Sequence, residues 1–199
     1  MKKNYGLLVT ILLVWTFTFA QEKKIHFDVM YKDGKVGVLH ALETKTKTKS
    51  LKILTIETSA SFFFISIHME SEISTTQKKG VLIEGAAYRN ASRKSSDVIA
   101  TVKKTGFRRY KRELNGVKDE IKNQHITFCV VDLYFKEPIG VEQVFSNMHA
   151  KMLQMKRVSV GKYRLITPDN KDSLYSYKAG KLVSIEANTL VGKVLSKRI

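Results

Sequence analysis

The stretch IHFDVMYKDGKVGVLHAL, residues 25–42, decides the fold class. From Ile25 to Tyr31 every second residue is apolar, which is the period of a β-strand with one buried face. Asp33-Gly34 follows and is typical of the two-residue type I′ turn that joins paired strands. From Val36 to Leu42 alternate residues (Val36, Val38, His40 and Leu42) again share one face. The stretch therefore predicts a β-hairpin.

The same period recurs in short segments along the rest of the chain. We expect further strands at residues 51–58, 62–70, 81–89, 97–103, 107–112, 158–166, 174–177, 182–187 and 191–199. Gly85 and Ala86 remove side chains in mid-strand, which indicates strong curvature, a bulge or the close approach of another group. About ten strands joined by tight turns predict a mainly β protein with a single curved antiparallel sheet or barrel. Curling is expected because so large a sheet has edges to protect.

The segment VDLYFKEPIGVEQVFS, residues 131–146, breaks this alternation. Residues 127–135 are almost wholly apolar, so periodicity does not separate a strand from a helix there. Thr127 as an N-cap and the stop at Glu137-Pro138 favour a short buried helix. Residues 141–148 then carry apolar side chains at three- and four-residue spacing. We expect one or two short helical segments near residues 127–148, on the concave side of the sheet.

The N-terminus has the pattern of a signal peptide. Lys2 and Lys3 precede an uncharged apolar run, and Ala20 stands at a suitable cleavage position. The alternative is an uncleaved membrane anchor, because the uncharged span is close to the ~18 residues of a transmembrane helix. We expect residues 1–20 to be removed, which leaves residues 21–199 as a single β-rich domain in the periplasm or outside the cell.

The net charge and the cysteine content indicate which partners the protein favours and what stabilises its fold. The chain has 35 Lys and Arg against 18 Asp and Glu, a formal net charge of +17. Such an excess favours contact with anionic surfaces. Cys129 is the only cysteine, so no internal disulfide forms and hydrophobic burial must hold the fold. Its apolar neighbours indicate a buried small side chain.

Several motifs together resemble a family. Leu133-Tyr134-Phe135, Glu137-Pro138 and Val144-Phe145-Ser146 are similar to the central motif of a family of small exported Gram-negative bacterial β-proteins of unknown function. The similarity continues through the early FDV (residues 27–29), Val36-Gly37, and the later Tyr163, Pro168-Asp169, Tyr175-Ser176-Tyr177 and Gly180. Asn147 departs from it, since the family has an acidic residue there. The resemblance implies export and a β-rich fold, without an activity. At fold level the protein also resembles half-barrel lipid carriers.

The central motif has two interpretations. In the first, Leu133, Tyr134 and Phe135 belong to the core and Glu137-Pro138 is a corner of the chain. In the second, Tyr134, Phe135 and Phe145 line a ligand pocket in which Glu137 is a polar contact. Both remain open from the sequence.

The segment KKTGFRRYKR, residues 103–112, suggests a second kind of site. Six of its residues are cationic, and two aromatic residues lie between them. In nucleic-acid-binding surfaces of this composition, the cations bind phosphates and the aromatic side chains stack on bases. The candidate anion-binding residues are Lys103, Lys104, Arg108, Arg109, Lys111 and Arg112. The alternative is a hairpin whose charges keep an exposed sheet edge from pairing. Lys45, Lys47 and Lys49 alternate with threonines and form a second cationic stripe.

Signatures of catalysis and of metal binding are sparse. The sequence has neither a G-x-S-x-G elbow nor an H-E-x-x-H motif, and its five histidines are scattered singly. Two pairs, His68 with Glu70 and His26 with Asp28, share a strand face as exposed polar positions do. We assign no catalytic residue, metal ligand or cofactor.

These observations lead to a ranked set of functions. The first is an exported, non-catalytic binding module or carrier for a lipid-like anionic amphiphile, monomeric, with an anionic lipid or an envelope glycan as partner. The second is an envelope-associated interaction protein that acts through its cationic surface. An enzyme of unrecognised type ranks last, because it needs a polar cleft with shifted ionisable groups. No motif indicates sequence-specific nucleic-acid recognition.

Overall fold

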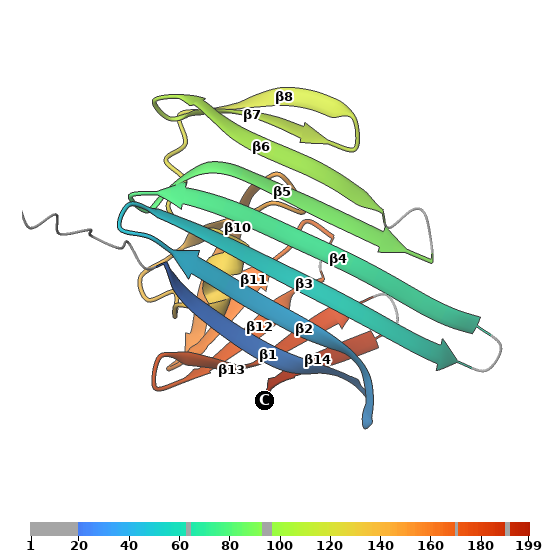
Figure 1. Cartoon of the computed structure of the whole chain (residues 1–199). Coiled ribbons are helices and arrows are strands. Elements are labelled where there is room, and N and C mark those ends of the chain that lie inside the picture. The colour runs from blue at the N-terminus through green and yellow to red at the C-terminus, as the bar shows by residue number, and fades with distance from the viewer. Residues whose placement is uncertain (1–19, 63–64, 93–96, 170, 190–191) are drawn as a thin grey trace, which may run out of the picture.

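The structure is a computed structural model that describes residues 20–62, 65–92, 97–169, 171–189 and 192–199. The expected signal peptide lies outside these residues except for Ala20, and so do residues 93–96. Figure 1 shows the described chain as one broad antiparallel sheet.

The first half of the chain is an uninterrupted meander of eight strands. Each strand pairs with the next in antiparallel register. The strands are β1 (Gln21–Tyr31), β2 (Gly34–Lys45), β3 (Lys49–Phe62), β4 (Ile65–Lys78), β5 (Val81–Ala91), β6 (Val98–Gly106), β7 (Arg109–Leu114) and β8 (Val117–Lys122).

The chain then crosses to the opposite edge and returns. The crossing segment, residues 123–142, contains the 3₁₀ turn η2 (Val130–Tyr134). Six strands follow and end beside β1: β9 (Gln143–Ser146), β10 (Lys151–Ser159), β11 (Lys162–Ile166), β12 (Ser173–Lys178), β13 (Lys181–Thr189) and β14 (Gly192–Arg198). Within the described residues the sheet has 14 strands in the order β8-β7-β6-β5-β4-β3-β2-β1-β14-β13-β12-β11-β10-β9. The sheet is open, with β8 and β9 at its edges.

The mainly β, antiparallel character is as predicted, but about ten strands was too few. β8 (VKDEIK) is largely polar and solvent-exposed, so it lacks the apolar alternation that marks a half-buried strand. β9 has only four residues. The single strand expected at residues 158–166 is divided between β10 and β11, because Gly161 turns the chain with a φ of +68°.

The helical prediction holds for one segment only. η2 is a single 3₁₀ turn, and the spacing at residues 141–148 belongs to β9, whose Phe145 pairs with Met152 of β10. Cys129 also forms a parallel bridge with Phe145. These strand contacts outweigh a weak helical period in so short a segment. Among the described residues, no helix has both the length and the apolarity needed to span a membrane.

The opening hairpin forms, with its turn displaced by one residue. Tyr31 pairs with Gly34, so the two loop residues are Lys32 and Asp33, and Lys32 has a φ of +52°. In β2 the buried face is the one with Leu39 and Ala41.

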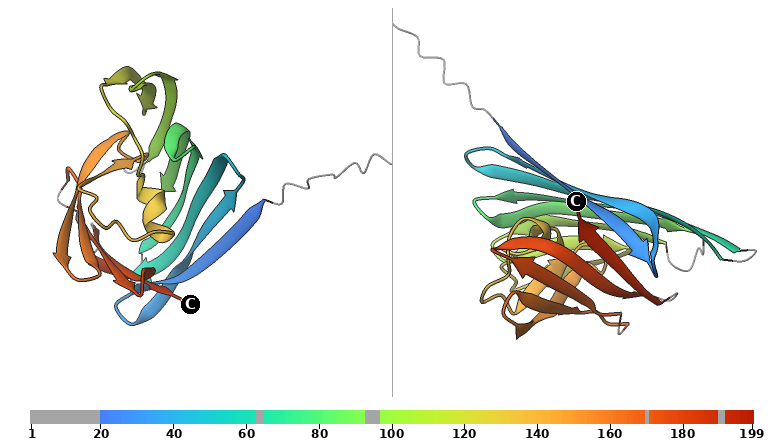
Figure 2. Two further views of the ribbon diagram at one scale, coloured as in Figure 1. Left: turned by 90° about the vertical axis from the view of Figure 1, so that its left-hand side faces the viewer. Right: turned by 90° about the horizontal axis from the view of Figure 1, so that it is seen from below.

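The sheet curls around the crossing segment. Figure 2 shows the two halves of the sheet facing each other with the η2 turn between them. Val131 and Leu133 of η2 are fully buried, and so is Phe27 of β1. The concave side of the sheet is therefore packed with side chains of the crossing segment.

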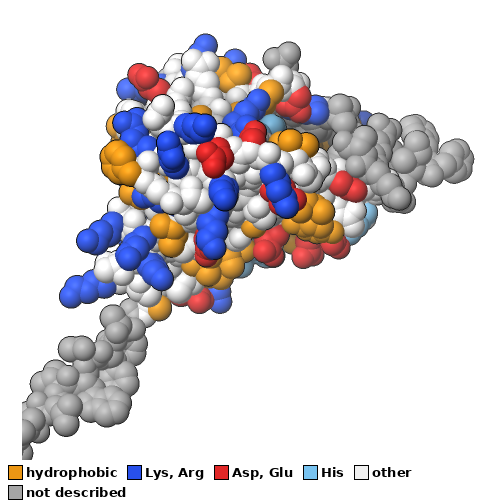
Figure 3. Space-filling view, turned by 90° about the horizontal axis from the view of Figure 1, so that it is seen from above, with side chains coloured by type: hydrophobic (Ala, Val, Ile, Leu, Met, Phe, Trp, Pro, Cys, Tyr) orange, Lys and Arg blue, Asp and Glu red, His pale blue; other side chains and the backbone are white. Residues whose placement is uncertain are grey.

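The turns of the first eight strands alternate between two ends of the sheet. Antiparallel register places Gln21 opposite Lys45, Lys49 opposite Lys78, and Arg109 opposite Lys122. We call this end, with the turns at residues 45–49, 78–81 and 106–109, the basic end. In the space-filling view of Figure 3, Lys and Arg side chains crowd the left-hand margin, where the basic end lies.

Candidate anion-binding pocket

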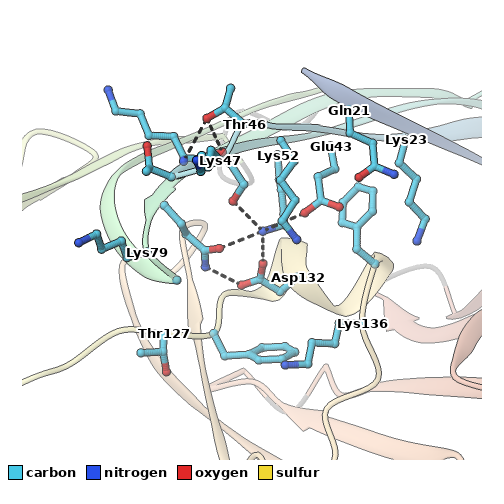
Figure 4. Close-up of a pocket in the computed structure, with 18 residues that line it drawn as sticks. Gln21, Lys23, Glu43, Thr46, Lys47, Lys52, Lys79, Thr127, Asp132 and Lys136 are labelled. Atoms are coloured by element: carbon cyan, nitrogen blue, oxygen red, sulfur yellow. Dashed lines mark hydrogen bonds and ion pairs between the residues drawn. The ribbon is translucent and has the colours of Figure 1, made fainter. Parts of the chain in front are cut away.

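A pocket of about 610 Å³ opens on the concave side at the basic end. Its walls come from the ends of β1–β4 that meet there, and its floor comes from the crossing segment (Figure 4). The lining residues are Gln21, Lys23, Glu43, Lys45, Thr46, Lys47, Thr48, Lys49, Ser50, Lys52, Gln77, Lys79, Gly80, Thr127, Phe128, Asp132, Phe135 and Lys136. Seven of these are lysines and two are acidic.

A buried polar network forms the floor of this pocket. The Lys52 ammonium lies 2.8 Å from Asp132 Oδ1 and donates to Gln77 Oε1 at 2.9 Å. It also lies 3.4 Å from Glu43 Oε1 and 3.3 Å from Ser50 Oγ. Gln77 Nε2 in turn donates to Asp132 Oδ2 at 3.0 Å. Figure 4 shows these side chains converging on Lys52.

Local structure explains why these charges are held in place. Lys52 alternates with Leu51 and Ile53 on β3, so its side chain lies on the concave face, as does that of Leu54. Asp132 is held by η2, where the backbone N–H of Cys129 donates to Asp132 Oδ2 at 2.6 Å. A buried charge is tolerated only when it is paired and hydrogen-bonded, and both side chains meet that condition.

The other lysines of the pocket have no such partners. Among the described residues, no carboxylate lies within salt-bridge distance of Lys23, Lys45, Lys47, Lys49, Lys79 or Lys136. Lys23 Nζ instead lies 5.8 Å from the centre of the Phe135 ring. Because Lys52 already faces Asp132 and Glu43, the six remaining lysines give the pocket a positive potential.

The residues of the central motif are divided between pocket and core. Phe135 is half-buried and lines the pocket. Tyr134 and Phe145 are buried, and Tyr134 contacts Phe27 edge-on with ring centroids 5.8 Å apart. Glu137 is half-buried and accepts a hydrogen bond from the Tyr163 hydroxyl at 2.8 Å.

The candidate anion-binding residues of segment 103–112 also differ in their surroundings. Lys103 pairs with Lys111 across β6 and β7, and the next strands place Glu84 and Glu120 on either side of this pair. The two lysines of this row are therefore adjacent, and an acidic residue flanks them on each side.

The Arg112 guanidinium is already paired within the fold. It forms a two-pronged pair with Asp119, one bond measuring 2.7 Å, and donates to the Ala150 carbonyl. The pair raises the pKa of Arg112 and lowers the pKa of Asp119. Lys104, Arg108 and Arg109 remain at the turn on the basic end.

Sequence reasoning missed Lys52, Gln77 and Asp132, the network on the pocket floor. A signal for Lys52 was present, since it occupies an alternate position with the apolar residues Leu54 and Ile56. The partner is 80 positions away in sequence, and only the crossing segment brings it near, so the pair itself had no local signature.

Cys129 is fully buried beside this network. Burial, and then the Asp132 carboxylate, raise the pKa of its thiol well above the ordinary value. The nucleophilic thiolate is therefore disfavoured. His68 lies 3.0 Å from Glu70 on the exposed face of β4, and no group of three possible metal ligands occurs within the described part of the chain.

Comparison with known proteins identifies a family to which no function is assigned. Residues 27–199 match a family described as a domain of unknown function, DUF6134. The chain belongs to the DUF6134 family. No curated protein matches it, and no solved structure matches it. The match covers every strand except the start of β1, so both the pocket and the network of this DUF6134 member lie almost wholly within the family domain.

Proposed function

We propose that this DUF6134 protein is an exported, non-catalytic binding protein that takes the acidic head group of an anionic amphiphile into the lysine-lined pocket. The observation that carries the proposal is a set of six lysines around one cavity, none of which has a carboxylate partner among the described residues. Lysine ammonium groups on flexible stems are suited to phosphate or carboxylate oxygens, since each offers three donors.

The walls of the pocket also suit an amphiphile. Phe128 and Phe135 offer apolar surface beside Lys23 and Lys136. Ligand pockets commonly combine apolar walls with a few charged groups that fix orientation. Because Val131 and Leu133 occupy the concave side behind the pocket, the proposal places only the head group and its adjoining atoms inside.

Export is part of the proposal and is supported by the leader-like pattern of residues 1–20. A binding role, rather than catalysis, is supported by the state of the Cys129 thiol, whose nucleophilic thiolate is disfavoured by burial.

The test is calorimetric titration with lauroyl lysophosphatidate and, as an uncharged match, monolauroylglycerol. The protein is expected to bind the phosphate-bearing lipid and not the glyceride. Changing Lys23 and Lys136 to Gln together is expected to weaken binding about tenfold or more, since charged hydrogen bonds are lost. Lys151 and Lys197, exposed and outside the pocket, give the matched control when changed to Gln.

Two results would contradict the proposal. One is equal affinity for both lipids, which would make the lysines irrelevant to recognition. The other is an equal loss in the pocket variant and in the control, which would point to net charge rather than to a site.

A further inference from the structure

The turn between β6 and β7 carries an exposed aromatic side chain among cations. Phe107 is 84% exposed and is followed by Arg108 and Arg109. A single exposed apolar side chain is ordinary on a protein surface. Here, however, it stands at the tip of a turn at the basic end, with Lys104 on the preceding strand.

The turn is held in a defined shape. Arg108 has a φ of +55°, and its guanidinium donates to the Asn123 carbonyl at 2.9 Å. The Gln124 N–H donates to the Arg108 carbonyl at 3.2 Å. The segment after β8 is therefore hydrogen-bonded to the turn and fixes its conformation. Phe107 is exposed on this fixed turn.

The three turns at this end carry charges of one sign. The turns KTKTK (residues 45–49), KKGV (78–81) and KTGFRR (104–109) contain no acidic residue. The Lys79 N–H donates to the Thr48 carbonyl at 2.9 Å, which ties the first two turns together. Arg109 faces Lys122 across β7 and β8, so like charges meet there. Such a pair is unfavourable in isolation, and an opposite charge supplied from outside relieves it.

We propose that the basic end docks on the surface of an anionic lipid bilayer, with Phe107 entering the interface between head groups and acyl chains. An aromatic side chain flanked by cations matches this boundary, where the ring meets apolar chains and the cations meet phosphates. Attraction between the basic turns and an anionic leaflet acts within about 10 Å, so it orients the molecule only at close approach.

This docking does not depend on the proposed function of the pocket, because none of Lys104, Phe107, Arg108 and Arg109 lines it. The two proposals share the same end of the sheet. Docking would turn the mouth of the pocket towards the head groups.

The experiment is co-sedimentation of protein, produced from the full-length sequence in an exporting host, with vesicles. One set contains equal parts phosphatidylglycerol and phosphatidylcholine, and the other contains phosphatidylcholine alone. Binding is expected to the anionic vesicles only, and to fall steeply as ionic strength rises from about 0.05 to about 0.3 M.

The variants separate charge from insertion. Changing Arg108 and Arg109 to Gln is expected to weaken vesicle binding about tenfold or more. Phe107→Ser is expected to weaken it about tenfold because the buried ring is lost. Two controls should stay within about twofold of the parent: Val117→Ser, at the opposite end of the β7–β8 hairpin, and the Lys151/Lys197 pair changed to Gln.

Three outcomes would overturn the proposal. They are equal binding to both vesicle types, unchanged binding of the Arg108/Arg109 variant, and unchanged binding of Phe107→Ser together with tighter binding to heparin than to vesicles. The last would identify a general polyanion surface. The Arg108/Arg109 variant should keep its lysophosphatidate affinity, and Lys136→Gln should keep its vesicle affinity, so each proposal fails separately.

Discussion

The η2 turn contacts the two halves of the sheet in different ways. Towards β3 and β4 it presents Asp132, which is paired with Lys52 and Gln77. Towards β12 and β13 it presents apolar groups, and the Tyr177 hydroxyl donates to the Leu133 carbonyl at 2.6 Å. Tyr134 also contacts Tyr175 edge-on with centroids 6.4 Å apart.

The difference shows what each contact contributes. Apolar packing stabilises in proportion to the surface it removes from water and tolerates small displacements. A buried ion pair adds little net stability against an apolar replacement, yet loss of one partner is severe. We therefore infer that the apolar side of η2 holds the halves together, whereas the polar side fixes the geometry of the pocket floor.

The largest effect is expected from Asp132→Ala. It leaves Glu43, at 3.4 Å, as the one carboxylate paired with the buried Lys52 ammonium among the described residues, and the free energy of unfolding should fall by about 4 kcal/mol. Urea denaturation measures it. Changing Lys52 to Met and Asp132 to Leu together should recover most of the loss. A double variant as unstable as the single one would contradict the view that the ion pair is dispensable for stability.

Leu133→Ala tests the apolar side and should cost about 3 kcal/mol, from lost burial and a residual cavity. The same denaturation series measures it. Lysophosphatidate affinity at low temperature should be unchanged, because Leu133 does not line the pocket. Loss of affinity in the folded variant would mean that the two sides of η2 are coupled.

Alkaline pH should weaken the apolar side of η2. Burial raises the pKa of Tyr134, Tyr175 and Tyr177 above the ordinary value near 10. Stability from these groups is complete below about pH 10 and is lost above it, because only the unfolded chain then ionises. The slope approaches about 1.4 kcal/mol per pH unit for each tyrosine. Tyr175→Phe should reduce that slope when unfolding is measured between about pH 9 and pH 11, and an unchanged slope would contradict the assignment.

Tyr177→Phe should give the smallest change, about 1 kcal/mol, because it leaves the buried Leu133 carbonyl without its donor. Tyr163→Phe is the matched control: it removes a hydroxyl bonded to Glu137, whose half-buried carboxylate keeps access to water. Thermal unfolding of both variants measures the contrast. A larger loss in Tyr163→Phe than in Tyr177→Phe would reverse the expected order.

Much of the sheet follows from local pattern, and the rest depends on distant contacts. β1, β5 and β13 were predictable because their alternation is strong and their ends carry Gly or turn residues. β9 was not, since its pairing with β10 and the bridge from Cys129 decide its conformation. Gly85 and Ala86 predicted strong curvature, a bulge or a close approach, and the structure shows the close approach, because a Cβ at Gly85 would lie 2.2 Å from Asn147 Nδ2.

The pocket was less accessible to sequence reasoning. The cationic stripe of Lys45, Lys47 and Lys49 was visible, and Phe135 was named as a candidate ligand contact. Two features bring the cationic stripe and Phe135 into one pocket. The register of β3 and β4 sets Lys49 opposite Lys78, and the crossing segment brings Phe135 beneath β1 and β2. Neither has a sequence signature, since both depend on pairings over long chain separations.

The pairing of β1 with β14 determines when the two halves of the sheet can join during folding. Phe27 lies opposite Arg198, and the Ile199 N–H donates to the His26 carbonyl at 3.1 Å. β14 leaves the ribosome after every other described strand, so until then one side of β1 and one side of β13 present unsatisfied backbone groups. Exposed strand edges recruit other chains. The nascent protein is thus most vulnerable to misassociation just before its two halves can be joined.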